Sequence, residues 1–152
     1  MKKANQDFTI LMADDDSDEY CLMKHAFAEK KVPGQLKFVS DGAELIDYLL
    51  HRGRFADVSE APKPHLIILD LNMPRINGKQ ALTEIRAMAK LREIPIIVFT
   101  SSRDSVDINQ SYQAGANSYI AKPQTLHEML DIVESLGSYW MKTVMLPCTD
   151  EF

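Results

Sequence analysis

The sequence predicts an α/β fold of three layers, in which a five-stranded parallel sheet lies between two layers of helices. Five short runs rich in aliphatic residues alternate strictly with five helical patterns along the 152 residues. The aliphatic runs are nearly continuous, which is typical of strands that helices cover on both faces. Two of these runs end directly in an acidic residue, Asp14 in one case and Asp70 in the other.

The first two units each consist of an apolar run followed by a helical pattern. Residues 8–13 predict a strand, and residues 17–31 predict a helix because Tyr20, Met23 and Phe27 recur on one face. The second strand and helix are expected at 36–39 and 42–50, and the apolar residues on that helical face are Leu45, Ile46 and Leu49. Residues 52–64 form the one long irregular stretch. With Pro62 and Pro64, this stretch predicts an extended surface loop.

The last three units repeat the pattern. Strands are expected at 66–69, 96–99 and 118–121, and a weaker helix at 105–113 stops before Gly115. A helix at 78–90 has an inward face of Ala81, Leu82, Ile85, Met88 and Ala89. The final helix, 125–144, has a predicted buried stripe of Leu126, Met129, Val133, Leu136 and Trp140.

Short, right-handed connections leave few topologies for this alternation. The two first choices are the flavodoxin-like (βα)5 fold with strand order 2-1-3-4-5 and half of a Rossmann fold. No G-x-G-x-x-G motif follows the first strand, which disfavours the Rossmann alternative.

Composition excludes several functional classes. With 45% hydrophobic and 26% charged residues, the chain resembles a soluble globular protein, and its length suits a single domain over 1–152. The net charge of -5 argues against a nucleic-acid partner. No apolar run approaches the roughly 20 residues of a membrane span. Cys21 and Cys148 are far apart and form no metal or redox motif, so we expect a cytoplasmic protein with reduced thiols.

Acidic side chains follow the first and third strands. The first strand ends in Asp14, Asp15 and Asp16, and the third ends in Asp70. Because parallel strands end at the same edge of a sheet, these carboxylates should lie close together when the two strands are neighbours. Crowded carboxylates repel each other unless a proton or a cation neutralises them. Oxygen ligands with room for water suit Mg²⁺, and Mn²⁺ would also fit.

A simpler interpretation is that some of these acids only cap the first helix. Aspartate is a favoured N-cap residue, and acids in a first turn suit the helix dipole. For Asp16 and Asp18 we favour this interpretation. It explains Asp14, Asp15 and Asp70 less well, because two separate strands end in acids at the same edge.

The fourth and fifth strands end in groups that bind phosphoryl oxygens. Thr100 offers a hydroxyl at the end of the fourth strand, and Lys122 offers an ammonium after the fifth. The acids would hold the metal, while the metal, the lysine and the hydroxyl would bind phosphoryl oxygens. One acid remains as a nucleophile that forms an acyl phosphate.

The sequence resembles the receiver domain of two-component response regulators over nearly its whole length, 8–144. The motifs that carry the resemblance are Ile10-Leu11-Met12-Ala13-Asp14-Asp15, Asp70-Leu71-Asn72-Met73-Pro74 with Gly78, Thr100-Ser101, and Ala114-Gly115-Ala116 leading to Tyr119-Ile120-Ala121-Lys122-Pro123. The long 52–64 segment departs from the usual spacing without removing a motif residue.

The resemblance implies a role for each site residue. Asp70 is the expected phosphoacceptor, and Thr100 and Lys122 are expected to hold the phosphoryl oxygens. Tyr119 stands at the position of the switch aromatic, whose rotamer is coupled to the Thr100 hydroxyl. The expected metal ligands are Asp15 and Asp70 through side chains, Asn72 through its carbonyl and Asp14 through a water. The family also implies a cis Lys122–Pro123 bond.

The resemblance further implies how the protein acts. The 52–64 segment and the ending 140–147 are similar to a subgroup of stand-alone receivers that serve phytochrome-type sensor kinases. Because only about seven residues follow the last helix, we expect no output domain, and so signalling through a changed protein partner. One alternative is a phosphorelay intermediate that passes its phosphoryl group to a histidine phosphotransfer protein. Two others, ranked lower, are an unphosphorylated interaction module and a phosphatase of the haloacid dehalogenase type.

An apolar surface near the end of the chain suggests self-association. Trp140 is expected to be at least half-buried, but Val144, Met145 and Leu146 would add an apolar patch. We therefore expect a homodimer through the face formed by 105–113, 118–121 and the last helix.

Overall fold

The computed structural model describes residues 8–147. Its five strands form one parallel sheet in the order β2-β1-β3-β4-β5, which confirms the predicted flavodoxin-like topology. The strands are β1 (Thr9–Ala13), β2 (Gln35–Val39), β3 (Leu66–Leu69), β4 (Ile96–Thr100) and β5 (Ser118–Ala121).

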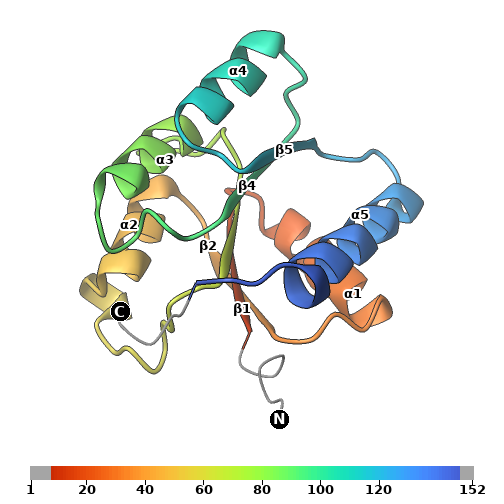
Figure 1. Cartoon of the computed structure of the whole chain (residues 1–152), viewed down its shortest axis with the longest axis horizontal. Coiled ribbons are helices and arrows are strands. Elements are labelled where there is room, and N and C mark those ends of the chain that lie inside the picture. The colour runs from red at the N-terminus through yellow and green to blue at the C-terminus, as the bar shows by residue number, and fades with distance from the viewer. Residues whose placement is uncertain (1–7, 148–152) are drawn as a thin grey trace.

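Helices cover both faces of this sheet. They are α1 (Ser17–Glu29), α2 (Gly42–Leu50), α3 (Gly78–Ala87), α4 (Ser105–Gln113) and α5 (Leu126–Ser138), with a 3₁₀ turn η1 (Gly53–Phe55) and a π turn η2 (Tyr139–Thr143). Figure 1 shows α1 and α5 on one face, and α2, α3 and α4 on the other. Within residues 8–147, none of these helices has the length and hydrophobicity that crossing a bilayer requires.

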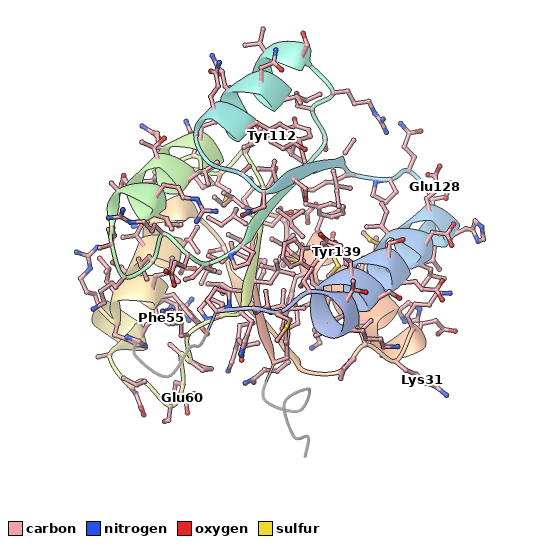
Figure 2. The ribbon with its side chains drawn as sticks, viewed as in Figure 1. Lys31, Phe55, Glu60, Tyr112, Glu128 and Tyr139 are labelled. Atoms are coloured by element: carbon pink, nitrogen blue, oxygen red, sulfur yellow. The ribbon has the colours of Figure 1, made fainter. Side chains whose placement is uncertain are left out.

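The segment between α2 and β3 lies largely at the surface as predicted, but it is folded against α2, so the prediction that it is extended was wrong. Phe55 and Ala61 are buried, whereas Glu60 lies at the surface. The hydroxyl of Tyr48 donates to the carbonyl oxygen of Pro62 at 2.8 Å. Figure 2 shows Phe55 and Glu60 on this segment. Apolar side chains at both ends of the segment have area to bury against α2, and this outweighs the extended tendency of the prolines.

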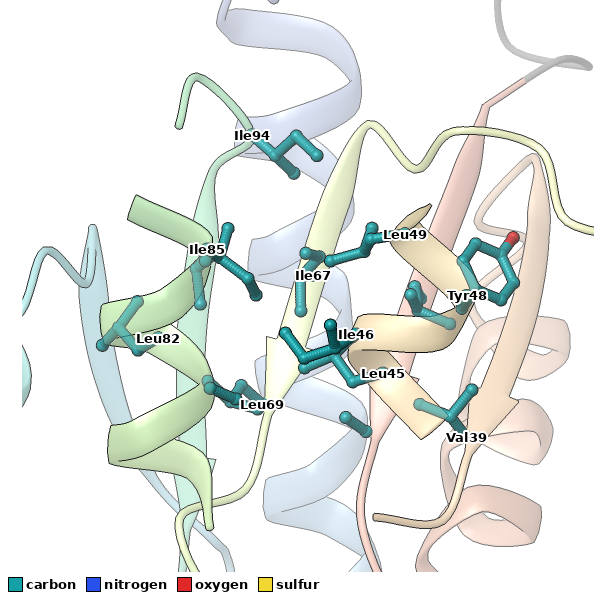
Figure 3. Packing of buried hydrophobic residues seen from close by; sticks show 14 of the residues in the cluster. Val39, Leu45, Ile46, Tyr48, Leu49, Ile67, Leu69, Leu82, Ile85 and Ile94 are labelled. Carbon is teal, nitrogen blue, oxygen red and sulfur yellow. The ribbon is translucent and has the colours of Figure 1, made fainter. Parts of the chain in front are cut away.

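The core has two parts, one on each face of the sheet. In β1, Leu11 and Ala13 join the cluster under α2 and α3, while Ile10 and Met12 join the cluster under α1 and α5. Successive side chains of a strand point to opposite faces, so a strand covered on both sides is apolar at nearly every position. Figure 3 shows the first cluster, where Ile67 and Leu69 of β3 pack between the two helices.

Three helices end earlier than predicted. The chain leaves α1 after Glu29 and turns at Lys31, which has a φ of 56°. It leaves α3 after Ala87 because Met88 is extended, with φ -95° and ψ 119°. The regular part of α5 ends at Ser138 and continues as η2. In α3 and α5 the regular helix ends before the hydrophobic pattern does, whereas in α1 the last apolar residue of the pattern, Phe27, still lies inside the helix.

Two predicted core positions are exposed. Leu126 is 47% exposed because it is the first residue of α5, directly after the N-cap Thr125. Ala89 is exposed because it lies beyond the end of α3, where helical spacing no longer applies. Trp140 is half-buried against the second cluster, as predicted.

Candidate functional site

The predicted convergence of acidic residues is confirmed at the carboxyl edge of the sheet. β1 and β3 are neighbours with Ala13 opposite Leu69, and the backbone N–H of Asp70 donates to the carbonyl oxygen of Ala13 at 2.9 Å. Carboxylate oxygens of Asp14, Asp15 and Asp70 all lie within 4.8 Å of one another. The cluster fits a divalent cation, because hard ions such as Mg²⁺ prefer oxygen ligands.

The acids differ in their surroundings. Asp14 and Asp70 are only 1% and 5% exposed, whereas Asp15 is exposed and accessible to a metal from solvent. Asp16 is the N-cap of α1, and its carboxylate accepts the N–H of Asp18 at 2.9 Å. The capping interpretation of Asp16 is therefore confirmed.

Lys122 joins the two buried acids. Its Nζ lies 2.8 Å from Oδ2 of Asp14 and 3.3 Å from Oδ2 of Asp70. The strand pairing holds it there, because the N–H of Lys122 donates to the carbonyl oxygen of Thr100 at 2.8 Å. Burial lowers the pKa of Lys122, but its contacts with Asp14 and Asp70 outweigh this effect and raise the pKa above its ordinary value. The ammonium is therefore held charged beside the acids.

Burial disfavours the charged form of Asp14, as it does that of Lys122, but for an acid this raises the pKa. It raises the pKa of Asp14 to about 6, against the lowering effects of Lys122 and of the Asp16 N–H, and with a further raising effect from the charge of Asp70. The ionised cluster is thus unfavourable by itself, and it would gain from a cation that neutralises it.

Thr100 and Tyr119 lie on the neighbouring strands β4 and β5. Thr100 is fully buried, and its Oγ1 lacks a hydrogen-bond partner within residues 8–147. An unpaired buried hydroxyl costs roughly 1–3 kcal/mol. Tyr119 is half-buried with its ring against the first core cluster, and its hydroxyl donates to the carbonyl oxygen of Ser102 at 2.8 Å.

The turn after β3 carries the fourth predicted metal ligand. The N–H of Asn72 donates to Oδ1 of Asp70 at 3.3 Å, so this turn curls back over the acid. The turn also forms one side of an open groove of about 530 Å³ beside the acids. The residues that line the groove are Asp15, Leu71, Asn72, Met73, Pro74, Asn77, Lys79 and Asp107.

The family follows from comparison with known proteins. A family model described as the response regulator receiver domain matches residues 10–134, which include Asp14, Asp70, Thr100 and Lys122. The chain belongs to this family. A receiver domain is a signalling module that is phosphorylated on an aspartate.

Three relatives are similar to this chain in sequence or structure over nearly their whole length. Response regulator Rcp1 of Synechocystis sp. is 30% identical over 145 residues, covering 95% of this chain and 97% of Rcp1. The structure of RPA3017, in red light signaling of R. palustris, is 34% identical with a TM-score of 0.88, covering 93% and 99% of the two chains. The phosphorylated cyanobacterial phytochrome response regulator RcpA is 34% identical with a TM-score of 0.86, again covering 93% and 99%.

One expectation drawn from the family is wrong for this receiver. No peptide bond within residues 8–147 is cis, so the Lys122–Pro123 bond is trans. The trans form is the lower in energy even before proline.

Sequence reasoning missed Lys79, Asp107 and Gln110, which lie beside the site. Oδ1 of Asp107 lies 2.6 Å from Nζ of Lys79, and its Oδ2 accepts the hydroxyl of Ser102 at 2.5 Å. Lys79 also donates to Oε1 of Gln110 at 2.5 Å. Asp107 is in the first turn of α4, where the helix dipole stabilises an acid, so its presence there needs no other explanation. No sequence signal pairs it with Lys79 on another helix.

The raised pKa of Asp14 predicts how the stability of the metal-free receiver depends on pH. Between the unfolded value of 3.8 and the folded value of about 6, the folded state holds a proton that the unfolded state has lost. The free energy of unfolding should therefore fall as pH rises from about 4 to 6, and level off above that range. Measured as the difference from Asp14→Asn, the free energy of unfolding should fall by about 2 kcal/mol over this pH range. This value allows for solvent screening.

Urea unfolding of both proteins in a chelating buffer, from pH 4 to 8, measures this difference. Subtracting the Asp14→Asn curve removes the contributions of titrating groups that lie far from Asp14, while those of Asp70 and Lys122, which interact with Asp14, stay in the difference. A difference that stays constant across this range would mean that burial does not raise the pKa of Asp14.

Proposed function

We propose that Asp70 accepts a phosphoryl group from a phosphohistidine of a sensor histidine kinase. The observation that carries this proposal is the placement of the Asp70 carboxylate, which is buried, 3.3 Å from Lys122 and grouped with Asp14 and Asp15. In the transfer, a carboxylate oxygen attacks phosphorus and the P–N bond to the imidazole breaks. The electron pair of that bond stays on the ring nitrogen, and Asp70 becomes an acyl phosphate.

The metal ligands in this proposal are Asp15 and Asp70 through their carboxylates, Asn72 through its backbone carbonyl and Asp14 through a water. An oxygen-only ligand set suits Mg²⁺ or Mn²⁺. The structure of the Mn²⁺-bound form of Rcp1, 30% identical with a TM-score of 0.83, supports this choice. The cation would supply positive charge for the phosphoryl oxygens.

Lys122 and Thr100 complete the phosphoryl site in this proposal. The Lys122 ammonium already lies between two acids, so it can bind a phosphoryl oxygen when the charge on Asp70 is converted to an acyl phosphate. The buried hydroxyl of Thr100 would donate to a second oxygen and gain the partner that it lacks. Since Tyr119 is on the next strand, its rotamer would report the change to the face formed by α4, β5 and α5.

The relatives indicate the class of kinase. RPA3017 acts in red light signaling, and RcpA is a phytochrome response regulator, so we propose a phytochrome-type sensor kinase as the partner. We place the exchange in the cytoplasm, where ATP supplies such kinases. RcpA has been solved in its phosphorylated form, which favours phosphorylation over an unphosphorylated interaction module.

Beryllofluoride, a mimic of the acyl phosphate, tests this proposal. We expect the receiver to gain thermal stability only when beryllofluoride and Mg²⁺ are both present, because each neutralises the other in the acidic pocket. Asp15→Asn should lose most of this gain. Asp18→Asn is the matched control, since Asp18 is an exposed acid in the first turn of α1, and it should respond like the wild type. An identical melting temperature with and without the two reagents would contradict the proposal.

A homodimer through α4, β5 and α5 stays a prediction. Several apolar side chains on these helices are exposed, among them Val106 and Tyr112 on α4 and Leu126 on α5. The tail contributes less than predicted, because Leu146 packs against the second core cluster while Met145 is 97% exposed.

A further inference from the structure

A chain of polar contacts joins α3, α4 and the loop after β4. Lys79 lies in the first turn of α3 and Asp107 in the first turn of α4, and their side chains form an ion pair at 2.6 Å. Asp107 accepts the hydroxyl of Ser102, which lies in the loop between β4 and α4. Lys79 and Asp107 are only 33% and 31% exposed, so water screens this ion pair less than it would a pair at the open surface.

Both ends of this chain reach the proposed phosphorylation site. At one end, Lys79 follows Gly78, whose N–H donates to the carbonyl oxygen of Leu71 at 2.9 Å. Leu71 is the residue directly after Asp70. At the other end, the carbonyl oxygen of Ser102 accepts the hydroxyl of Tyr119, and Ser102 is two residues from Thr100. The contacts therefore connect the turn after Asp70 with the switch aromatic.

We propose that Lys79 and Asp107 are positioning residues that hold the loop carrying Ser102 where its carbonyl oxygen binds the Tyr119 hydroxyl. This inference rests on the proposed function. The two residues form a link between the turn after Asp70 and Tyr119 that does not pass through the Thr100 hydroxyl. Neither residue needs to touch the phosphoryl group for this role.

The unpaired hydroxyl of Thr100 indicates which state the link favours. In the arrangement that the link holds, the Tyr119 hydroxyl has a partner while the Thr100 hydroxyl is buried without one inside the described part of the chain. A phosphoryl oxygen on Asp70 would supply the missing acceptor. The arrangement is thus complementary to the phosphorylated state, and stabilising it should tighten the binding of a phosphoryl mimic.

The affinity for beryllofluoride at saturating Mg²⁺ tests the link. Two variants are compared, one that removes a positive charge and one that removes a negative charge. We expect Lys79→Met and Asp107→Asn each to weaken beryllofluoride binding by about threefold to tenfold. A general electrostatic effect on the anion would instead weaken binding in Lys79→Met and strengthen it in Asp107→Asn. Lys90→Met is the matched control, because Lys90 is exposed beyond the other end of α3, and it should bind like the wild type.

A double-mutant cycle with Tyr119→Phe shows whether the effect runs through the tyrosine hydroxyl. In the Tyr119→Phe background, Lys79→Met should change beryllofluoride affinity by less than about twofold, because the bond that the link positions is already lost. Ser102→Ala, which removes the hydroxyl but keeps the carbonyl, should weaken binding like Asp107→Asn. Urea unfolding of each variant, without beryllofluoride, confirms that the measured proteins are folded.

The outcomes separate the link from the proposed function. If the wild type binds no beryllofluoride, the proposed function fails. If the wild type binds and both variants bind equally well, or shift in opposite directions, the link is overturned while the proposed function stands. An undiminished effect of Lys79→Met in the Tyr119→Phe background also overturns it.

Discussion

Asp70→Asn is expected to abolish phosphorylation of the receiver by acetyl phosphate and Mg²⁺. An amide has no carboxylate oxygen to attack phosphorus, so no acyl phosphate can form. The fold should persist, because asparagine has nearly the same shape and Lys122 keeps its ion pair with Asp14. Intact-protein mass spectrometry measures the phosphorylated fraction directly.

The matched control for this prediction is Asp18→Asn, which removes an exposed acid of α1 and should be phosphorylated like the wild type. Full phosphorylation of Asp70→Asn would remove Asp70 from the role of nucleophile. Phosphorylation lost from both variants would instead indicate that general charge, rather than the Asp70 carboxylate, controls the reaction.

Gly78→Ala is expected to destabilise the receiver by about 2–4 kcal/mol. A Cβ at Gly78 would lie 2.2 Å from the carbonyl oxygen of Asp70 and 2.6 Å from Cα of Leu71. These are backbone atoms at the end of the buried strand β3, so they cannot move aside as a side chain could. Any shift that relieves the clash also displaces Asp70, and phosphorylation should slow as well.

Gly137→Ala is the matched control, because the atoms nearest to its Cβ would be side-chain atoms of Val32, at 3.1 Å and beyond. The helix propensity of alanine within α5 offsets this contact, so we expect a change within about 1 kcal/mol. Urea unfolding measures both variants. Equal stability of Gly78→Ala and the wild type would show that the turn after β3 can open without cost.

Much of the fold was predictable because its central strands β1, β3 and β4 are buried on both faces. A strand such as β3 is then apolar at nearly every position, and a run of that kind stands out in the sequence. The ends of helices were less predictable. The extended backbone of Met88 ends α3, although Met88 and Ala89 continue its hydrophobic pattern. Local turns and long-range packing decide such ends, and periodicity records neither.

The acids and Lys122 were predictable because a parallel sheet brings the carboxyl ends of its strands to one edge. Long-range polar contacts were not predictable. The guanidinium of Arg86 donates to the carbonyl oxygen of Gly115 and to Oδ1 of Asn117, which are far from it in sequence. Arginine at such a position is ordinary for a helix surface, so only the packed structure reveals the contact.

The sequence by itself determined the alternation of strands and helices, the edge at which Asp14, Asp70 and Lys122 gather, and the chemistry open to them, because these depend on where apolar runs stop. Only the tertiary structure decided that Lys122 lies between both buried acids, that the Thr100 hydroxyl has no hydrogen-bond partner among residues 8–147, and that α3 is joined to α4. Those features depend on distances of a few ångströms between side chains on different elements. Such distances arise from the packing of the whole domain and leave no local pattern of residues.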